Sequence, residues 1–155
     1  MKCFLKEVNL QTKKEDCFYD ITESVKKIVK DAGIKNGHIL IQPMHTTVGI
    51  FLNENEERLL KDFVNFLCNK APCGINYLHD DILLRKDNCP LDEPVNGHSH
   101  IRATCYSNPS LSLILYDNKI QLGTYQKILL AEFDGPCPRR YKSMRKYLVS
   151  VIGDE

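Results

Sequence analysis

No charge of one sign dominates this sequence. Lysine and arginine number 21 against 20 aspartates and glutamates, which leaves a net charge of +1. Such a balance provides no global positive field for binding nucleic acid or a membrane surface. No apolar run approaches the roughly 18 residues of a membrane span. The segment from Met1 to Glu7 also lacks the apolar stretch of a signal peptide. We therefore expect a cytoplasmic protein with no nucleic-acid partner and no membrane partner.

Several well-known functional motifs are also missing. The sequence contains no GxGxxG or Walker loop and no GxSxG element. These motifs mark dinucleotide sites, phosphate-binding loops and serine hydrolases, so none of those classes is indicated. It carries neither an RNA-recognition motif nor a helix-turn-helix signature.

Cysteine is plentiful, but no CxxC pair occurs. The seven cysteines are odd in number and irregularly spaced. Without a secretory signal, this pattern argues against a disulfide framework and favours small, reduced, hydrophobic side chains. The nearest approach to a zinc pattern is Cys68-x4-Cys73, followed by His79 and Cys89. A structural zinc at these residues is the lesser alternative.

Hydrophobic periodicity predicts two helices in the first half of the chain. Apolar residues between Ile21 and Ala32 fall on one helical stripe, and Gly33 is a typical helix stop. A second helix follows the acidic segment 53–57, with an asparagine as its expected cap, and ends near Pro72.

Strands are predicted for most of the remaining chain. Apolar and β-branched alternation indicates strands at 3–11, 15–20, 37–42, 46–53, 111–116, 119–122, 125–133 and 145–152. Asp117-Asn118 is expected to form a two-residue turn, and 98–107 a short helix. These elements predict an α+β fold with an antiparallel sheet or a sandwich, and one domain over 1–155.

The segment 74–97 has no clear period and is long for a connecting loop, which is typical of functional loops. It carries an acidic cluster that could hold Mg²⁺ with a diphosphate substrate, or could simply be solvated. Its members are Asp80, Asp81, Asp87, Asp92 and Glu93.

Four of the five histidines lie in polar, turn-rich segments, whereas His38 falls on a predicted buried strand. The four are His45, His79, His98 and His100. Three neutral imidazoles with a water make an open zinc site, and solvated surface histidines are the alternative.

Two further patterns leave alternatives open. Gln126 and Glu132 bracket apolar residues on one strand face, which indicates either the edge of a site or a solvent-facing rim. A basic stretch could bind phosphate groups; a nucleic-acid contact is the lesser interpretation. Its members are Arg139, Arg140, Lys142, Arg145 and Lys146.

Several separated motifs, in order, resemble those of the YjbQ family. His45-Thr46-Thr47 leading to Asn53-Glu54-Asn55 resembles its HT[ST]…NEN motif, and 76–80 (NYLHD) resembles its NYxHD segment. The stretch 99–103 (SHIRA) resembles its [AS]HI[KR] segment, and 122–126 (LGTYQ) its GTWQ motif, with Tyr125 in place of tryptophan. The resemblance extends through 132–136 (EFDGP) and runs from about Cys3 to Gly153.

This resemblance implies a compact α+β domain with a β-sandwich of mostly antiparallel strands and two to three helices, assembled as a homotrimer. It also implies a possible secondary thiamine-phosphate synthase activity, which joins a pyrimidine methyl diphosphate to a thiazole phosphate. The implied partner is therefore a small phosphorylated molecule. Two alternatives remain: a metal-dependent hydrolase using a three-histidine site, and a non-catalytic trimer that binds a small ligand or a metal.

The resemblance also implies the residues of the site. His45, His79 and His100 are expected to bind one divalent metal, with zinc as the first choice and Mg²⁺ possible beside a diphosphate. These three histidines and Glu132 are the expected catalytic residues. Asp80 is expected to accept a hydrogen bond from a liganding imidazole. The expected substrate-binding residues are Thr47, Asn53, Arg102, Thr124 and Gln126.

Overall fold

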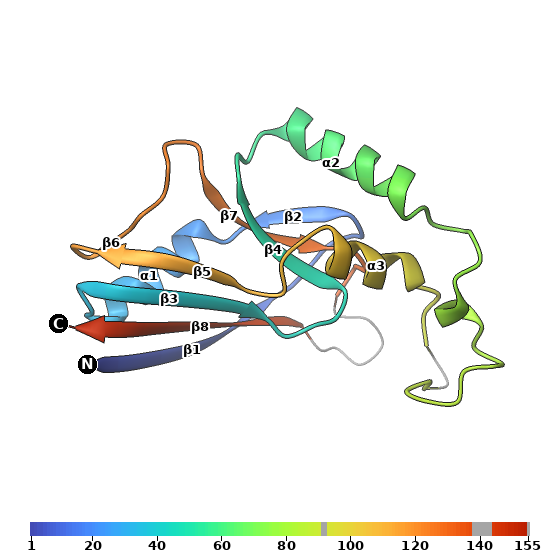
Figure 1. The fold of residues 1–155 in the computed structure, drawn as a ribbon, viewed down its shortest axis with the longest axis horizontal. Coiled ribbons are helices and arrows are strands. Elements are labelled where there is room, and N and C mark those ends of the chain that lie inside the picture. Colours follow the sequence, from blue (N-terminus) through green and yellow to red (C-terminus); the bar gives the residue numbers. More distant parts are fainter. Residues whose placement is uncertain (91–92, 138–143, 155) are drawn as a thin grey trace.

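The computed structural model describes residues 1–90, 93–137 and 144–154. Its strands form two antiparallel sheets (Figure 1). The larger sheet has the order β1 (Lys2–Leu10), β8 (Arg145–Asp154), β3 (Asn36–Pro43), β5 (Leu111–Tyr116) and β6 (Lys119–Ile120). The smaller sheet has the order β2 (Cys17–Asp20), β7 (Lys127–Glu132) and β4 (Val48–Asn53).

Three α-helices and one 3-10 turn complete the chain: α1 (Thr22–Ala32), α2 (Glu57–Lys70), η1 (Leu78–Asp80) and α3 (Gly97–Cys105). The expected fold class, an α+β arrangement of mostly antiparallel strands with two to three helices, is confirmed. None of the described helices combines the length and apolar character needed to cross a bilayer.

The main core lies between the two sheets and includes the apolar face of α1. The larger sheet contributes Ile39, Val149 and Val151, and β7 of the smaller sheet contributes Ile128 and Leu130. Because side chains alternate along a strand, the next residues of β7 face the other way. A second apolar cluster therefore joins Ala131 to residues of α2 and α3.

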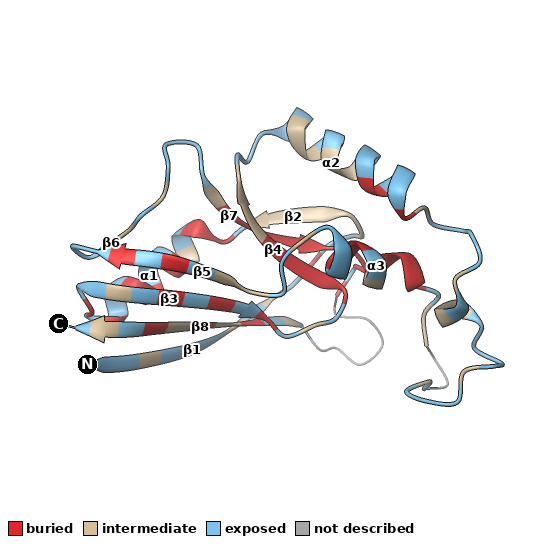
Figure 2. Cartoon of the chain, viewed as in Figure 1, coloured by how far each residue is buried: buried red, intermediate tan, exposed pale blue. Residues whose placement is uncertain are grey.

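Burial differs sharply between the helices (Figure 2). Five residues of α1 are buried, as its apolar stripe predicts. Leu67 is the single buried residue of α2, so this helix covers the smaller sheet without being enclosed. The φ angles of Asp117 and Asn118 are 49° and 58°, which confirms the predicted turn between β5 and β6.

The structure corrects the expected boundaries at two places that affect the site. β4 begins at Val48 rather than at Thr46, so 45–47 lie in a bend before the strand. α2 is capped by Glu56, whose carboxylate accepts the backbone N–H groups of Arg58 and Leu59, and not by an asparagine. Among the expected site residues, Asp92 and the basic residues Arg139, Arg140 and Lys142 lie outside the described part of the chain.

Candidate functional site

A cavity of about 700 Å³ brings together all three histidines that the resemblance points to. His45 precedes β4, His79 lies in η1, and His100 belongs to the first turn of α3. The start of β8 adds Arg145. The remaining lining residues are Thr46, Thr47, Arg85, Asp87, Asn88, Glu93, Pro94, Asn96 and Asp134.

The His79 and His100 rings lie next to each other in this cavity. Their ring centroids are 4.4 Å apart, and both side chains are half-buried. Burial and the neighbouring His79 hold the pKa of His100 below its usual value. A neutral His100 can present a nitrogen lone pair to a metal or to a proton.

His45 lines the same cavity but is held by β8. The backbone N–H of Lys146 donates to His45 Nε2 at 3.0 Å, and Arg145 Nη1 lies 3.5 Å from His45 Nδ1. Burial and the Arg145 charge lower the pKa of His45. This imidazole is therefore neutral, and one of its two nitrogens already has a backbone partner.

Arg145 is anchored by Glu132, a fully buried residue at the end of β7. The guanidinium donates from Nε to Oε2 at 2.6 Å and from Nη2 to Oε1 at 2.8 Å. Thr12 Oγ1 and the backbone N–H of Asp134 donate to the same carboxylate. Glu132, expected to be catalytic, does not line the cavity; its place in the structure is that of a positioning residue behind Arg145.

Asn96 takes the place that the sequence assigned to Asp80. The Oδ1 atom of Asn96 lies 3.2 Å from His79 Nε2, and its Nδ2 donates to Asp134 Oδ2 at 2.9 Å. Asp80 Oδ1 instead accepts the backbone N–H of Gly97 at 2.8 Å, at the start of α3. Asp80 therefore accepts a hydrogen bond from the first backbone N–H group of α3, which has no partner within the helix.

A second arginine lies beside His79. Arg85 Nη1 donates to Glu93 Oε1 at 2.8 Å and to the carbonyl oxygen of His79 at 3.2 Å. The same nitrogen is 3.5 Å from His79 Nε2. The segment 74–97, which the sequence marked as a functional loop, therefore supplies His79, Arg85, Glu93 and Asn96 to one cavity wall.

The structure does not bring every expected residue to this cavity. Thr47 lines it, and its Oγ1 accepts from Arg145 Nη2 at 3.5 Å. A strand beginning at His45 would place Asn53 on the same face as His45, but β4 begins only at Val48. Asn53 instead lines a separate groove beside α2. Thr124 and Gln126 are exposed in the connection between β6 and β7.

Arg102 is the clearest departure from the expected site. Its side chain is completely buried, and Nη1 donates to both carboxylate oxygens of Asp16, at 2.7 and 2.6 Å. Its Nε donates to the carbonyl oxygen of Ala71. Located two residues after His100 on α3, Arg102 points toward a different set of side chains because i and i+2 diverge on a helix.

Among the described residues, one set of three His, Cys, Asp or Glu donor atoms lies within 4.8 Å of one another: Glu15, Cys73 and His98. His45, His79 and His100 share a cavity without forming such a set. The pair His79 and His100 is therefore the part of the histidine cluster already arranged for a shared ligand.

Comparison with known proteins identifies the family. The family described as UPF0047 protein YjbQ-like matches residues 6–154. The chain belongs to this family. It is 35% identical over 153 residues to a UPF0047 protein of Methanothermobacter thermautotrophicus, which covers 99% of this chain and 94% of the relative. It is 31% identical over 142 residues to YugU of Bacillus subtilis, covering 87% and 93% of the two chains.

Solved structures of YjbQ-like proteins share the fold. The Sulfolobus solfataricus protein, described as YbjQ-like and of unknown function, matches with a TM-score of 0.83 and 28% identity over 99% of both chains. An uncharacterised family member from Clostridium acetobutylicum matches with a TM-score of 0.78 and 32% identity, over 95% of this chain and 99% of that one. These relatives support the fold and the family, and they assign no reaction.

Reasoning from sequence missed five residues of this YjbQ-like cavity: Arg85, Asn88, Pro94, Asn96 and Asp134. Asp134 was visible in the 132–136 motif, next to the predicted Glu132. Arg85 and Asn96 lie in an aperiodic stretch, where spacing alone cannot tell which side chains face inward.

Proposed function

We propose that this YjbQ-like protein is a cytoplasmic enzyme whose active site is the histidine cavity, acting on a small phosphorylated molecule with a bound divalent cation. The observation that carries this proposal is the convergence of His45, His79 and His100 with two arginines in one cavity of about 700 Å³. A volume of this size fits a small molecule.

The charges of the cavity favour a cation together with an anion. Among the residues that the structure describes, three carboxylates line it, those of Asp87, Glu93 and Asp134, against the two guanidinium groups of Arg85 and Arg145. With neutral histidines, the lining is therefore one unit negative and would repel a phosphate. A bound dication would reverse that sign and allow a phosphorylated ligand to enter.

The residues present fit such a cation. His79 and His100 adjoin, and the lowered pKa of His100 keeps its imidazole neutral, as metal ligation requires. Asn96 Oδ1, fixed by the contact of its Nδ2 with Asp134, can orient the His79 ring. When bound, zinc or Mg²⁺ would supply positive charge to stabilise a departing phosphate or diphosphate.

The chain's own residues would hold and orient the substrate. Arg145 is fixed by Glu132 with its Nη2 toward Thr47, so it can donate to a phosphate oxygen without first ordering its side chain. In the thiamine-phosphate synthase reaction, a thiazole nitrogen bonds to the pyrimidine methylene carbon while the carbon–oxygen bond to diphosphate breaks. The electron pair leaves with the diphosphate, where Arg85 and Arg145 can stabilise it.

Metal-dependent hydrolysis is the second candidate. The observation that favours it is the pair of adjoining imidazoles, because histidine-held zinc suits water activation better than diphosphate departure. Both candidate reactions use the histidine cavity. The second reactant is the thiazole phosphate in the synthase reaction and water in hydrolysis.

One assay separates them. The purified chain, loaded with zinc or Mg²⁺, is given the pyrimidine methyl diphosphate with and without the thiazole phosphate, and thiamine phosphate and diphosphate are quantified. Synthase activity requires both substrates, whereas hydrolysis releases diphosphate or phosphate from one. His79→Ala and His100→Ala should lose at least about 100-fold in rate, since each removes a group proposed to bind the metal.

His38→Ala is the matched control, because His38 is exposed on β3 and does not line the cavity. It should retain parental activity and metal content. Equal metal content in His100→Ala and in the parent would contradict the metal site. A metal-loaded protein that turns over neither substrate would favour the non-catalytic alternative.

A further inference from the structure

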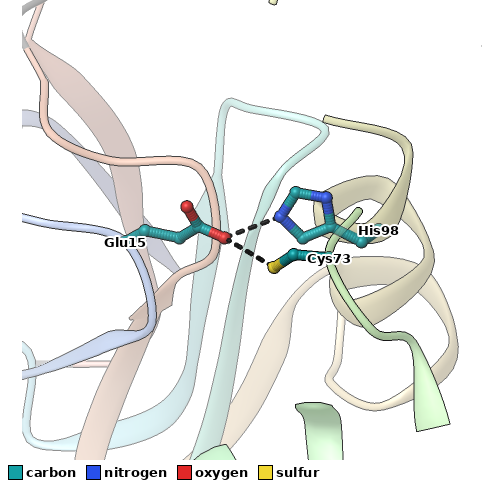
Figure 3. A group of neighbouring side chains, drawn as sticks. All are labelled: Glu15, Cys73 and His98. Carbon is teal, nitrogen blue, oxygen red and sulfur yellow. Dashed lines mark hydrogen bonds and ion pairs between the residues drawn. The ribbon is translucent and has the colours of Figure 1, made fainter. Parts of the chain in front are cut away.

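A second polar cluster lies outside the histidine cavity, where three segments distant in sequence meet (Figure 3). Glu15 precedes β2, Cys73 follows α2, and His98 is in the first turn of α3. His98 is buried, whereas Cys73 is exposed and Glu15 is intermediate. The cluster therefore has a fixed inner ligand and an outer face that solvent ions can reach.

The contacts among these three side chains converge on one oxygen atom, and Ser99 Oγ also lies 3.2 Å from His98 Nε2. Glu15 Oε1 lies 2.6 Å from His98 Nε2, and Cys73 Sγ donates to the same Oε1 at 3.6 Å (Figure 3). Carboxylate, imidazole and thiolate are the three ligand types that zinc uses in proteins. Without a metal, the imidazole and the thiol are each hydrogen-bonded to the Glu15 carboxylate.

The three donor atoms lie within 4.8 Å of one another, and one of their distances already matches a tetrahedral zinc site. With Zn–N and Zn–O of about 2.0 Å and Zn–S of about 2.3 Å, tetrahedral ligands lie about 3.3 Å (N to O) and about 3.5 Å (S to O) apart. The sulfur-to-oxygen distance of 3.6 Å already fits. The nitrogen-to-oxygen distance must widen by about 0.7 Å from its 2.6 Å. Glu15 can provide that movement because its side chain is 39% exposed.

Arg102 lies beside the cluster, and its positive charge must be balanced. Its Nη1 is 3.7 Å from Glu15 Oε1 but is paired with both oxygens of Asp16. With zinc bound, the three positive charges of Zn²⁺ and Arg102 meet three negative charges on Glu15, Asp16 and a Cys73 thiolate. The neighbourhood is then neutral.

Arg102 also supports the thiolate that a metal requires. Its Nη2 donates to Cys73 Sγ at 3.5 Å. Burial raises the pKa of the Cys73 thiol, while the Arg102 charge opposes that shift. In the metal-free protein Cys73 is therefore a thiol, and metal binding must displace its proton.

We propose that Glu15, Cys73 and His98 form a zinc site, completed by a water molecule, that is separate from the histidine cavity. The Cys73 S–H bond breaks as the sulfur–zinc bond forms, and the proton leaves to solvent. The Nε2 proton of His98 leaves to solvent while Nδ1 keeps or takes up one proton, so the neutral ring binds zinc through Nε2 and coordination replaces the hydrogen bond to Glu15. The site ties the β1–β2 connection and the segment after α2 to α3, the helix that carries His100.

Cobalt(II) is the probe that tests this site, because a cobalt–thiolate bond gives a near-ultraviolet charge-transfer band that histidine and carboxylate ligands do not. The full-length chain is titrated with Co²⁺ under reducing conditions, and zinc is then added to displace it. The parent should show the band at one equivalent, and Cys73→Ser should lose it. Glu15→Gln should weaken Co²⁺ binding at this band at least about tenfold.

Two control variants make the assignment specific. Cys68→Ser should keep the band, although Cys68 Sγ contacts the same Arg102 Nη2 at 3.7 Å, because it is not among the three converging donors. His79→Ala should also keep it, which separates this site from the proposed active site. Far-ultraviolet circular dichroism checks that each variant is folded. If Cys73→Ser does not fold, the weaker Co²⁺ binding expected for Glu15→Gln is the result that tests the site.

The proposal is overturned by absence of the band in the parent at saturating Co²⁺. It is equally overturned if folded Cys73→Ser retains the band, or if Cys68→Ser loses it as fully as Cys73→Ser does. Loss of the band in His79→Ala would mean that the thiolate belongs to the other metal site.

Discussion

Two arginines, each paired with a carboxylate, have opposite positions relative to the cavity. Arg102 and Arg145 each meet a carboxylate in a two-pronged contact, with Asp16 and Glu132 respectively. Arg102 is enclosed completely, whereas Arg145 keeps one face on the cavity. The degree of burial, and not the residue type, therefore determines which of these two arginines can contact a ligand.

Tyr147 shows how a single buried hydroxyl makes stability depend on pH. It is 1% exposed, its hydroxyl pairs with Ser24 Oγ at 2.9 Å, and burial raises its pKa. A pKa raised in the folded state gives stability that is complete below the unfolded value of about 10 and is lost as pH rises through the folded value. The free energy of unfolding should therefore fall more steeply above about pH 10 in the parent than in Tyr147→Phe.

Urea unfolding at pH 8 and near pH 11 measures this difference. Tyr116→Phe is the control, since Tyr116 is exposed on β5 and should follow the parent. Identical alkaline losses in the parent and in Tyr147→Phe would contradict the assignment.

At the scale of elements, one ion pair joins the two sheets beside the cavity. Glu132 ends β7 of the smaller sheet, and Arg145 begins β8 of the larger one. Removing one partner from a buried pair leaves the other charge uncompensated, at a cost of about 3–5 kcal/mol. Glu132→Gln should therefore lower the free energy of unfolding by about this amount, measured by chemical denaturation.

Glu7→Gln is the matched control for that substitution. Glu7 also pairs with a cation of β8, the Lys146 ammonium at 3.0 Å, but both side chains are about half exposed. Exposed pairs contribute about 0–1 kcal/mol, so this variant should stay close to the parent. Similar losses in the two variants would show that burial does not control the strength of the pair.

The elements were predictable because local pattern determines them. The helical stripe of α1 and the turn-prone Asp117-Asn118 pair needed no knowledge of the rest of the fold. The three histidines of the cavity came from the motif resemblance, and the structure brings all three to its lining.

The unpredicted parts of the site depend on contacts between distant segments. The partner of His79 is Asn96, 17 residues away, and not the adjacent Asp80. Asn53 was placed near His45 by extending strand alternation through 45–47, which lie in a bend. Which polar side chains face one another is decided by packing across the fold, and spacing along the chain does not contain that information.

At the scale of the whole molecule, two expected substrate residues are far from the cavity. In Figure 1 the connection between β6 and β7, which carries Thr124 and Gln126, stands at the opposite end from α3. Neither residue lines the histidine cavity of its own chain. If they serve the same site, a second copy of the chain must supply them.

The resemblance to the YjbQ family implies a homotrimer, and we expect the β6–β7 connection of one subunit to reach the histidine cavity of the next. A cyclic assembly allows each subunit to give this connection and to receive it, so every site is completed alike. Light scattering at micromolar concentration should give three times the 17.8 kDa chain mass. A monomer would contradict this expectation.

Mixed assemblies test whether the sites are shared between subunits. His100→Ala and Gln126→Ala chains, each impaired alone, are unfolded together and refolded into mixed trimers. If each site combines His100 from one chain with Gln126 from its neighbour, some mixed sites receive both native residues and regain turnover, while others lose both. Recovery above that of separately refolded proteins is the expected result. No recovery, in trimers that mass spectrometry shows to be mixed, would place the whole active site within one chain.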